Sequence, residues 1–129
     1  KLKITELNEY KLPDKPSPSE IAKCIETEGA AIASKIPQNA VVAAMCIEGE
    51  MLSSESFSQK LENLMSDESA SELCFIIGGS YGLSDEIKKR AKLKLSLSRM
   101  TFTHQISRVL ILEQIYRAFQ ISTGGKYHK

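Results

Sequence analysis

The sequence lacks the compositional biases that mark specialised protein classes. It has no tryptophan, only 4 prolines and 7 glycines in 129 residues, and 42% hydrophobic and 26% charged side chains. These values exclude collagen, a coiled coil and a disordered chain. They fit a single globular domain over residues 1–129.

Long apolar runs are also absent. Residues 40–47 form one of the longest, far short of the roughly 20 residues that span a bilayer. No charged start followed by an apolar core indicates a signal peptide. We therefore expect a soluble, cytoplasmic protein without a membrane partner.

Cysteine is scarce, and its spacing excludes two kinds of site. Cys24, Cys46 and Cys74 lie in separate apolar segments, which fits neither a disulfide framework nor zinc-ligand spacing. We interpret them as buried thiols. Helical histidine pairs and a Gly-x-Ser-x-Gly turn are missing too, so hydrolase and metal-dependent activities are disfavoured and we expect no metal.

The charge is divided unevenly along the chain. Residues 1–87 carry 7 basic and 15 acidic side chains, whereas residues 88–129 carry 10 basic side chains and one acidic one, Glu113. A basic region of this kind is usually a solvated face. Its scale nevertheless favours a polyanionic partner such as nucleic acid.

Hydrophobic periodicity predicts an α/β fold with the element order βαβαβαβα. Ser17, Pro18 and Glu20 form a helix start, and Pro37 ends that helix. The remaining helices are predicted near residues 54–65, 85–92 and 104–121, and the strands at residues 2–7, 40–47, 73–77 and 93–97. This order predicts a parallel sheet with helices on both faces.

The last predicted helix has too many apolar positions for a single stripe. It needs two surfaces to bury them. In a domain of this size, we expect the second surface to be another copy of the chain around a two-fold axis.

Three segments combine chemically useful residues, but each also has a simpler interpretation. The glycine turn at Gly78, Gly79 and Gly82 follows a predicted strand, where open α/β sheets bind ligands, yet a tight turn explains it equally well. Residues 97–104 resemble a pocket rim, although His104 suits a helix cap or an interface. The closing Tyr-His-Lys is either functional or a frayed terminus.

Taken together, FIIGGSYGLSDEI (75–87), LSLSRMTFTHQISRVLILEQIYRAFQI (95–121) and the closing YHK resemble the bacterial RlmH family of ribosomal RNA methyltransferases. The resemblance covers essentially the whole chain. It implies a SPOUT-class methyltransferase domain over residues 1–129, with a C-terminal trefoil knot, acting as a homodimer. Family members carry a further strand and helix before the position that matches Lys1.

The resemblance also implies the reaction and the cofactor. The family transfers a methyl group from S-adenosyl-L-methionine to N3 of a pseudouridine in 23S rRNA, on the assembled ribosome. The positions that match its cofactor-binding residues are Met45, Gly78, Leu97, Ser98, Arg99, Met100, Thr101 and Phe102.

A second set of positions matches the substrate side of the family. The catalytic candidates are Glu113, Arg117, Tyr127 and His128, and the RNA-binding candidates are His104, Arg108 and Lys129. Methylation at N3 requires loss of the imide proton, so we expect His128 to act as a base or an orienting group. An arginine would hold phosphate or stabilise the imide anion.

Two other functions compete with this interpretation. One is an RNA-binding module that kept the fold without catalysis. The other is a nucleotide-binding enzyme of a different kind, which only the glycine turn suggests.

Overall fold

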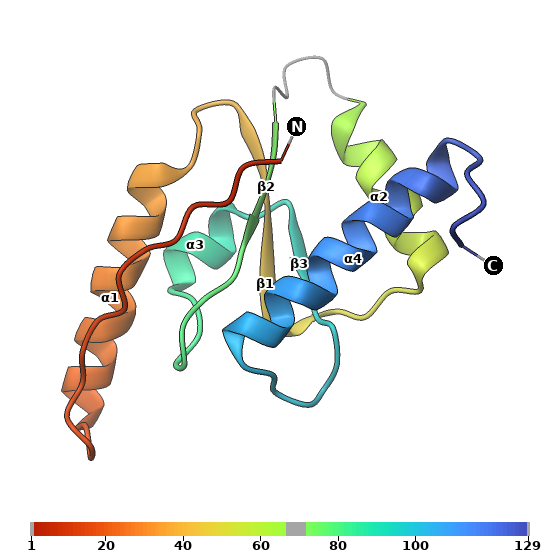
Figure 1. Cartoon of the computed structure of the whole chain (residues 1–129). Helices are drawn as coiled ribbons and strands as arrows, with labels where there is room; N and C mark the ends of the chain where they lie inside the picture. The colour runs from red at the N-terminus through yellow and green to blue at the C-terminus, as the bar shows by residue number, and fades with distance from the viewer. Residues whose placement is uncertain (1, 67–71, 129) are drawn as a thin grey trace.

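The computed structural model describes residues 2–66 and 72–128, and a parallel sheet lies at its centre (Figure 1). Its strands are β1 (Ala40–Glu50), β2 (Glu72–Ile76) and β3 (Leu93–Leu95), in the spatial order β2-β1-β3. Both pairings are parallel. The predicted α/β class with a parallel sheet is confirmed.

Strand β1 supplies the middle of the sheet because its apolar run can be covered on both faces. Val42, Ala43 and Ala44 are buried. Ala44 pairs with Ile76 of β2, and Met45 pairs with Leu95 of β3. These registers fix which loops meet at the carboxyl end of the sheet.

Helices α1 (Pro18–Lys35) and α3 (Asp85–Arg90) cover one face of the sheet. α1 begins with the predicted capping box between Ser17 and Glu20, and α3 begins at the cap Ser84. α3 ends two residues before the predicted position. The core of this layer consists of Val42, Ala44, Ile76, Leu83 and Ile87.

Helices α2 (Ser54–Met65) and α4 (His104–Ser122) pack side by side on the opposite face. The buried hydroxyl of Ser58 donates a 2.8 Å hydrogen bond to the Ala118 carbonyl and so joins the two helices. This core contains Ala43, Phe57, Leu61, Leu93, Leu95, Ile111 and Ala118. Helices therefore lie on both faces, as predicted.

The predicted strand at residues 2–7 is wrong. The segment has no regular structure, and Leu2, Ile4 and Leu7 are exposed, because alternation makes a strand only where a neighbouring strand edge accepts it. The segment instead passes from one layer to the other. The Tyr10 backbone N–H donates to Glu28 of α1 at 3.2 Å, and Glu6 forms an ion pair with Arg108 of α4 at 2.6 Å.

The cysteines only partly match the expectation of buried thiols. Cys24 is fully buried, whereas Cys46 and Cys74 are half-buried. Burial raises the pKa of all three thiols, so they are weak nucleophiles at neutral pH. No helix in residues 2–66 and 72–128 has both the length and the apolarity needed to cross a membrane.

Candidate active site

The carboxyl ends of the three strands bring the predicted cofactor positions to one edge of the sheet. Gly78 lies two residues beyond Ile76, and Leu97 lies two residues beyond Leu95. Because Ala44 pairs with Ile76 and Met45 with Leu95, the end of β1 separates these two loops. Parallel sheets place their ligands at this edge.

The glycine turn is shaped by its own packing. Gly82 has φ +84°, a backbone conformation that favours glycine at position 82. Its N–H donates to the Gly79 carbonyl at 3.0 Å and closes the turn. A Cβ on Gly78 would stand 2.9 Å from the side chain of Leu83. The tight turn therefore explains these glycines without a ligand, and Gly78 offers only its backbone to the edge.

The loop between β3 and α4 presents backbone groups and side chains that are neutral except for Arg99. Ser96 is buried and donates to the Ser98 carbonyl at 2.9 Å, and the Met100 N–H donates to the Ser98 hydroxyl at 3.0 Å. The other amides of residues 97–102 have no partner in the described part of the chain. This loop fits a neutral heterocycle such as adenine, which backbone donors and acceptors can recognise.

Met100 and Phe102 do not belong to the core. Met100 is 73% exposed and Phe102 is 37% exposed, so both are available to a ligand or to a second chain. Thr103 then caps α4 by accepting the Ile106 N–H at 3.3 Å. His104 is the exposed first residue of the helix rather than its cap.

The four catalytic candidates lie together, at the second half of α4 and in the tail that follows it. Arg117 donates to Glu113 through Nε and Nη2, at 3.2 and 3.0 Å, and the Tyr127 hydroxyl donates to the same carboxylate oxygen at 3.1 Å. The Arg117 guanidinium also lies 4.8 Å from the centre of the Tyr127 ring. The tail is thus fixed onto α4.

The hydrogen bonds of His128 determine its protonation pattern. Its Nδ1 lies 2.9 Å from Nη1 of Arg117, and a guanidinium can only donate, so Nδ1 is the acceptor. Nε2 then carries the proton and donates it to the carboxylate of Glu55. Both ring nitrogens are engaged in this arrangement.

Sequence reasoning missed Glu55. Its position in the first turn of α2 suits the helix dipole and carries no sign of a contact with the tail. It is separated from His128 by 73 residues, and no local pattern connects the two. Gln114 was missed for the same reason; it links Glu113 to Ser54 through hydrogen bonds of 2.8 Å on each side.

These contacts shift the pKa values of the cluster in consistent directions. The hydrogen bond from Arg117 lowers the pKa of the Glu113 carboxyl, and the bond with His128 lowers that of Glu55. The pKa of the Tyr127 phenol is raised, because its proton is held by the Glu113 carboxylate. At neutral pH the cluster therefore contains two carboxylates, one guanidinium and an intact phenol.

The cofactor edge and the catalytic cluster are separated within one chain. Arg117 follows Thr103 by 14 residues along α4, which corresponds to roughly 20 Å at the rise of an α-helix. Figure 1 shows the tail beside α2 and the second half of α4, while the loop of residues 96–103 lies at the start of α4.

Two of the three RNA-binding candidates lie close together. His104 and Arg108 lie one turn apart at the start of α4, and Arg108 is paired with Glu6. Lys129 lies outside the described residues.

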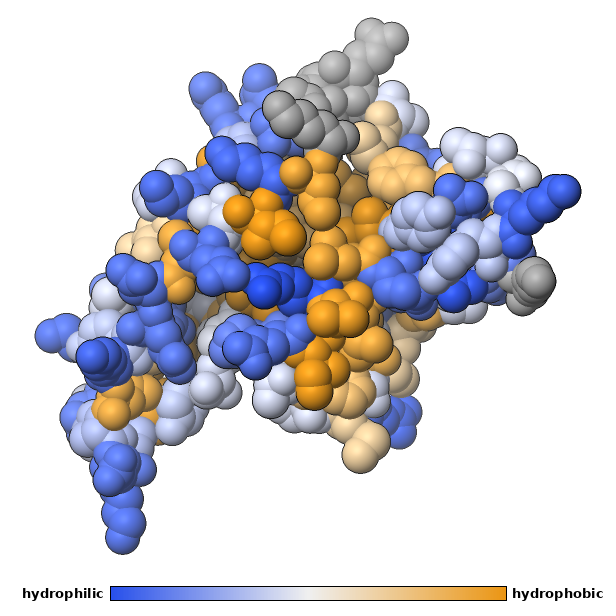
Figure 2. All heavy atoms as spheres, viewed as in Figure 1, coloured by the Kyte–Doolittle hydropathy of each residue, from blue (hydrophilic) through white to orange (hydrophobic). Residues whose placement is uncertain are grey.

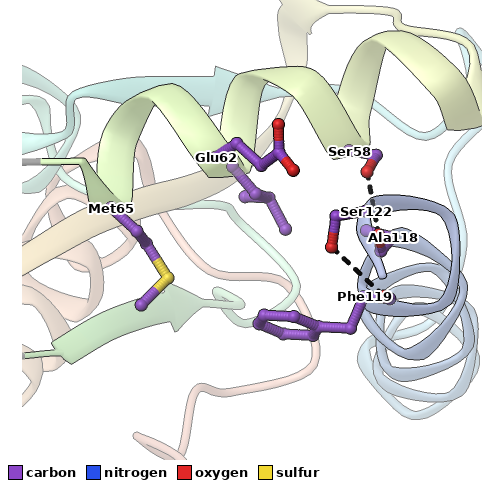
Figure 3. Close-up of a pocket in the computed structure, with 7 residues that line it drawn as sticks. Ser58, Glu62, Met65, Ala118, Phe119 and Ser122 are labelled. Atoms are coloured by element: carbon purple, nitrogen blue, oxygen red, sulfur yellow. Dashed lines mark hydrogen bonds between the residues drawn. The ribbon is translucent and has the colours of Figure 1, made fainter. Parts of the chain in front are cut away.

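Two pockets have none of the predicted site residues in their linings. One, of about 280 Å³, lies between α2 and α4 and is lined by Ser58, Leu61, Glu62, Met65, Ala118, Phe119 and Ser122 (Figure 3). The hydroxyls of Ser58 and Ser122 already donate to helix carbonyls, so Glu62 supplies the charged group of this lining. The other, of about 810 Å³, lies between the N-terminal segment, α1 and the glycine turn.

Comparison with known proteins identifies the family of the chain. A family model described as a predicted SPOUT methyltransferase matches residues 1–128. Two proteins named Ribosomal RNA large subunit methyltransferase H, from Clostridioides difficile (strain 630) and Streptococcus pneumoniae (strain CGSP14), are each 48% identical over all 129 residues of this chain and 80% of their own length. A match at this level over the whole chain establishes that this protein is an enzyme of the SPOUT methyltransferase family.

Proposed function

We propose that this enzyme transfers a methyl group from S-adenosylmethionine to N3 of a pseudouridine in 23S rRNA, on assembled ribosomes in the cytoplasm, as a knotted homodimer. The names of the two relatives support the ribosomal RNA of the large subunit as substrate. The observation that carries the proposal is a cluster of the four catalytic candidates, in which Glu113, Tyr127 and His128 surround the guanidinium of Arg117.

The cofactor would lie at the carboxyl edge of the sheet. The backbone of residues 97–102 would bind its adenine, with Met45 and Gly78 bordering the site from β1 and β2. The bound sulfonium supplies an electrophilic methyl group. A loop with one charged residue, Arg99, and several unpaired amides suits this neutral recognition.

The chain's own residues would handle the imide proton. Arg117 releases Nδ1 of His128 when it turns to the substrate and donates to an imide oxygen, where negative charge develops as N3 loses its proton. The freed Nδ1 lone pair accepts that proton. Glu55 then faces the resulting imidazolium through Nε2–H, as a carboxylate does in other histidine-based sites.

A second copy of the chain would complete the site. In one chain, the tail and the cofactor loop lie at different positions along α4, so the tail of one subunit would serve the loop of its partner. α4 also exposes apolar side chains that a partner would cover. Figure 2 shows apolar side chains gathered over α4, and the most exposed on this helix are Ile106, Val109, Tyr116 and Phe119.

The test is methylation of assembled ribosomes from cells that lack this protein. Mass spectrometry after incubation with the enzyme and S-adenosylmethionine should show one added methyl on a pseudouridine. Titration calorimetry with the cofactor alone should show binding, and sedimentation should give a dimer. An enzyme that binds the cofactor but leaves every pseudouridine unmodified would refute the substrate assignment.

A further inference from the structure

A dense group of cations extends from the last turn of α3 into β3. Lys88, Lys89, Arg90, Lys92 and Lys94 fall within seven residues. Lys88 forms an ion pair with Glu48 at 2.5 Å. The other four are exposed and pair with no carboxylate in residues 2–66 and 72–128.

These four cations follow one border of the molecule. β3 is an edge strand, and the Lys92 N–H at its start donates to the Val42 carbonyl at 2.8 Å. Leu93 and Leu95 point into the core shared with α2 and α4, so Lys94 projects toward the α3 side. Lys94 therefore lies on the same side of the sheet as the end of α3.

Helix stability explains only part of this pattern. Basic residues in the last turn of α3 interact favourably with its dipole, which accounts for Lys89 and Arg90. Lys92 and Lys94 lie beyond that helix. The acidic residues of α3, Asp85 and Glu86, are in its first turn, at the opposite end. Lys94 is close enough to Glu48 to help lower the pKa of that carboxyl, but none of the four cations forms an ion pair within the described residues. At this spacing they repel one another, which a folded chain retains at a cost to stability.

We propose that Lys89, Arg90, Lys92 and Lys94, here called the β3-edge strip, bind phosphates of the ribosomal RNA outside the reaction site. The inference rests on the proposed function for the identity of the polyanion. The strip lies on the α1 and α3 side of the sheet, whereas the catalytic tail lies against α2 and α4. RNA bound by both would pass around the β3 edge, and the strip would contribute affinity without touching the reacting atoms.

The experiment compares two triple variants of equal charge. Lys89→Gln/Lys92→Gln/Lys94→Gln removes most of the strip, and Lys11→Gln/Lys15→Gln/Lys23→Gln removes three exposed lysines from the N-terminal segment and α1. Both lower the net charge from +1 to −2. Affinity for large ribosomal subunits within assembled ribosomes is measured over a series of salt concentrations, together with kcat and KM for methyl transfer.

We expect the slope of log K against log[salt] to become shallower by about 2 in the strip variant, because each phosphate that a cation no longer neutralises reduces it by roughly 0.7–0.9. The KM of this variant should rise several-fold at an unchanged kcat, and the control variant should match the wild type. Equal losses of affinity in both variants would show that only total charge matters. No loss in either would show that the strip is a solvated face, and both results would overturn the proposal.

Cross-linking of the wild-type enzyme to the subunits identifies the partner without any substitution. Links from Lys89, Lys92 and Lys94 to nucleotides support the proposal, whereas links to a ribosomal protein overturn it. The two failures remain distinguishable. Wild-type enzyme that methylates subunits while the strip stays unlinked refutes the strip alone, and wild-type enzyme without methylation refutes the proposed function.

Discussion

Gly49 of β1 lies directly against the backbone of Lys94 in β3, so that a Cβ on this glycine would stand 2.6 Å from the Lys94 carbonyl carbon. A backbone atom cannot move aside as the end of a flexible side chain can. The pairing register of β1 with β3 shifts at this point, between Met45 and Glu50. The close approach therefore accompanies a return of β1 to β3, in which Glu50 pairs with Leu95, the residue that Met45 also pairs with.

The first prediction is that Gly49→Ala lowers the free energy of unfolding by about 2–3 kcal/mol, because the two strands must separate. Chemical denaturation measures this. Gly79→Ala is the matched control, since its added Cβ would meet only the movable carboxylate of Glu28, at 3.0 Å. Equal stability of the two variants would contradict the close packing.

The second prediction concerns Glu55, which we expect to act through His128. His128→Ala should lower kcat by roughly 10² to 10⁴, and Glu55→Ala by roughly 10- to 100-fold, because the ring loses its orienting partner. Glu55→Gln keeps an acceptor for Nε2–H and should retain more activity than the alanine variant.

The double variant distinguishes this role from a purely structural one. Glu55→Ala should have no further effect on kcat in an enzyme that already carries His128→Ala. An additional loss in the double variant would mean that Glu55 acts by another route.

The third prediction tests whether two subunits share each site. His128→Ala removes the tail function, and Thr101→Trp obstructs the exposed loop of residues 97–102. Each variant alone should be inactive. A mixture in equal amounts, allowed to exchange subunits, should recover about a quarter of wild-type activity, because half of the dimers then hold one intact site. A mixture that stays inactive would place the tail and loop of each site in the same chain.

The fourth prediction is a pH window for docking of the tail. The pKa of the Glu113 carboxyl is lowered from 4.5, so its contribution is present above that pH and is lost as the pH falls through the lowered value. The pKa of Tyr127 is raised from 10.0, so its contribution is lost as the pH rises through the raised value.

This pH window can be measured by recording NMR spectra of the Tyr127 ring over a series of pH values. The protein carries His128→Gln, so that no imidazole next to the ring adds to the pH dependence. The ring signals should stay constant between these limits and move toward those of a free tyrosine outside them. Glu113→Gln removes the titrating carboxyl, so the acidic limit should disappear. The basic limit should move to lower pH, because the Tyr127 phenol loses the carboxylate that raises its pKa. A tail signal that is independent of pH would contradict the docked arrangement.

Most of the fold follows from local patterns in the sequence. The capping box at Ser17, the apolar run of β1 and the alternation around Leu93 each specify an element through neighbours in the chain. The same reasoning failed for the N-terminal segment, because its alternating residues have no adjacent strand edge to pair with. Periodicity reports the shape that a segment can adopt, and pairing requires a partner.

The candidate site was predictable only as far as the family resemblance named its residues. Glu113 and Arg117 lie one helical turn apart, so their contact follows from spacing. The contact of His128 with Glu55 depends on how α2 packs against α4, which no local pattern encodes. The cations of the β3-edge strip are visible in the sequence, whereas their shared side of the sheet is set by the register of β3.

The full burial of Ala43 and Ala44 ties the two helical layers to each other. These neighbours face opposite cores, and both are 0% exposed. A larger residue at either position would push the helices on its own side of the sheet outward. It would also tilt β1 toward the helices on the opposite side. Evolutionary change in one half of the molecule is thereby constrained by the other half, so we expect substitutions on the two faces of β1 to arise in compensating pairs.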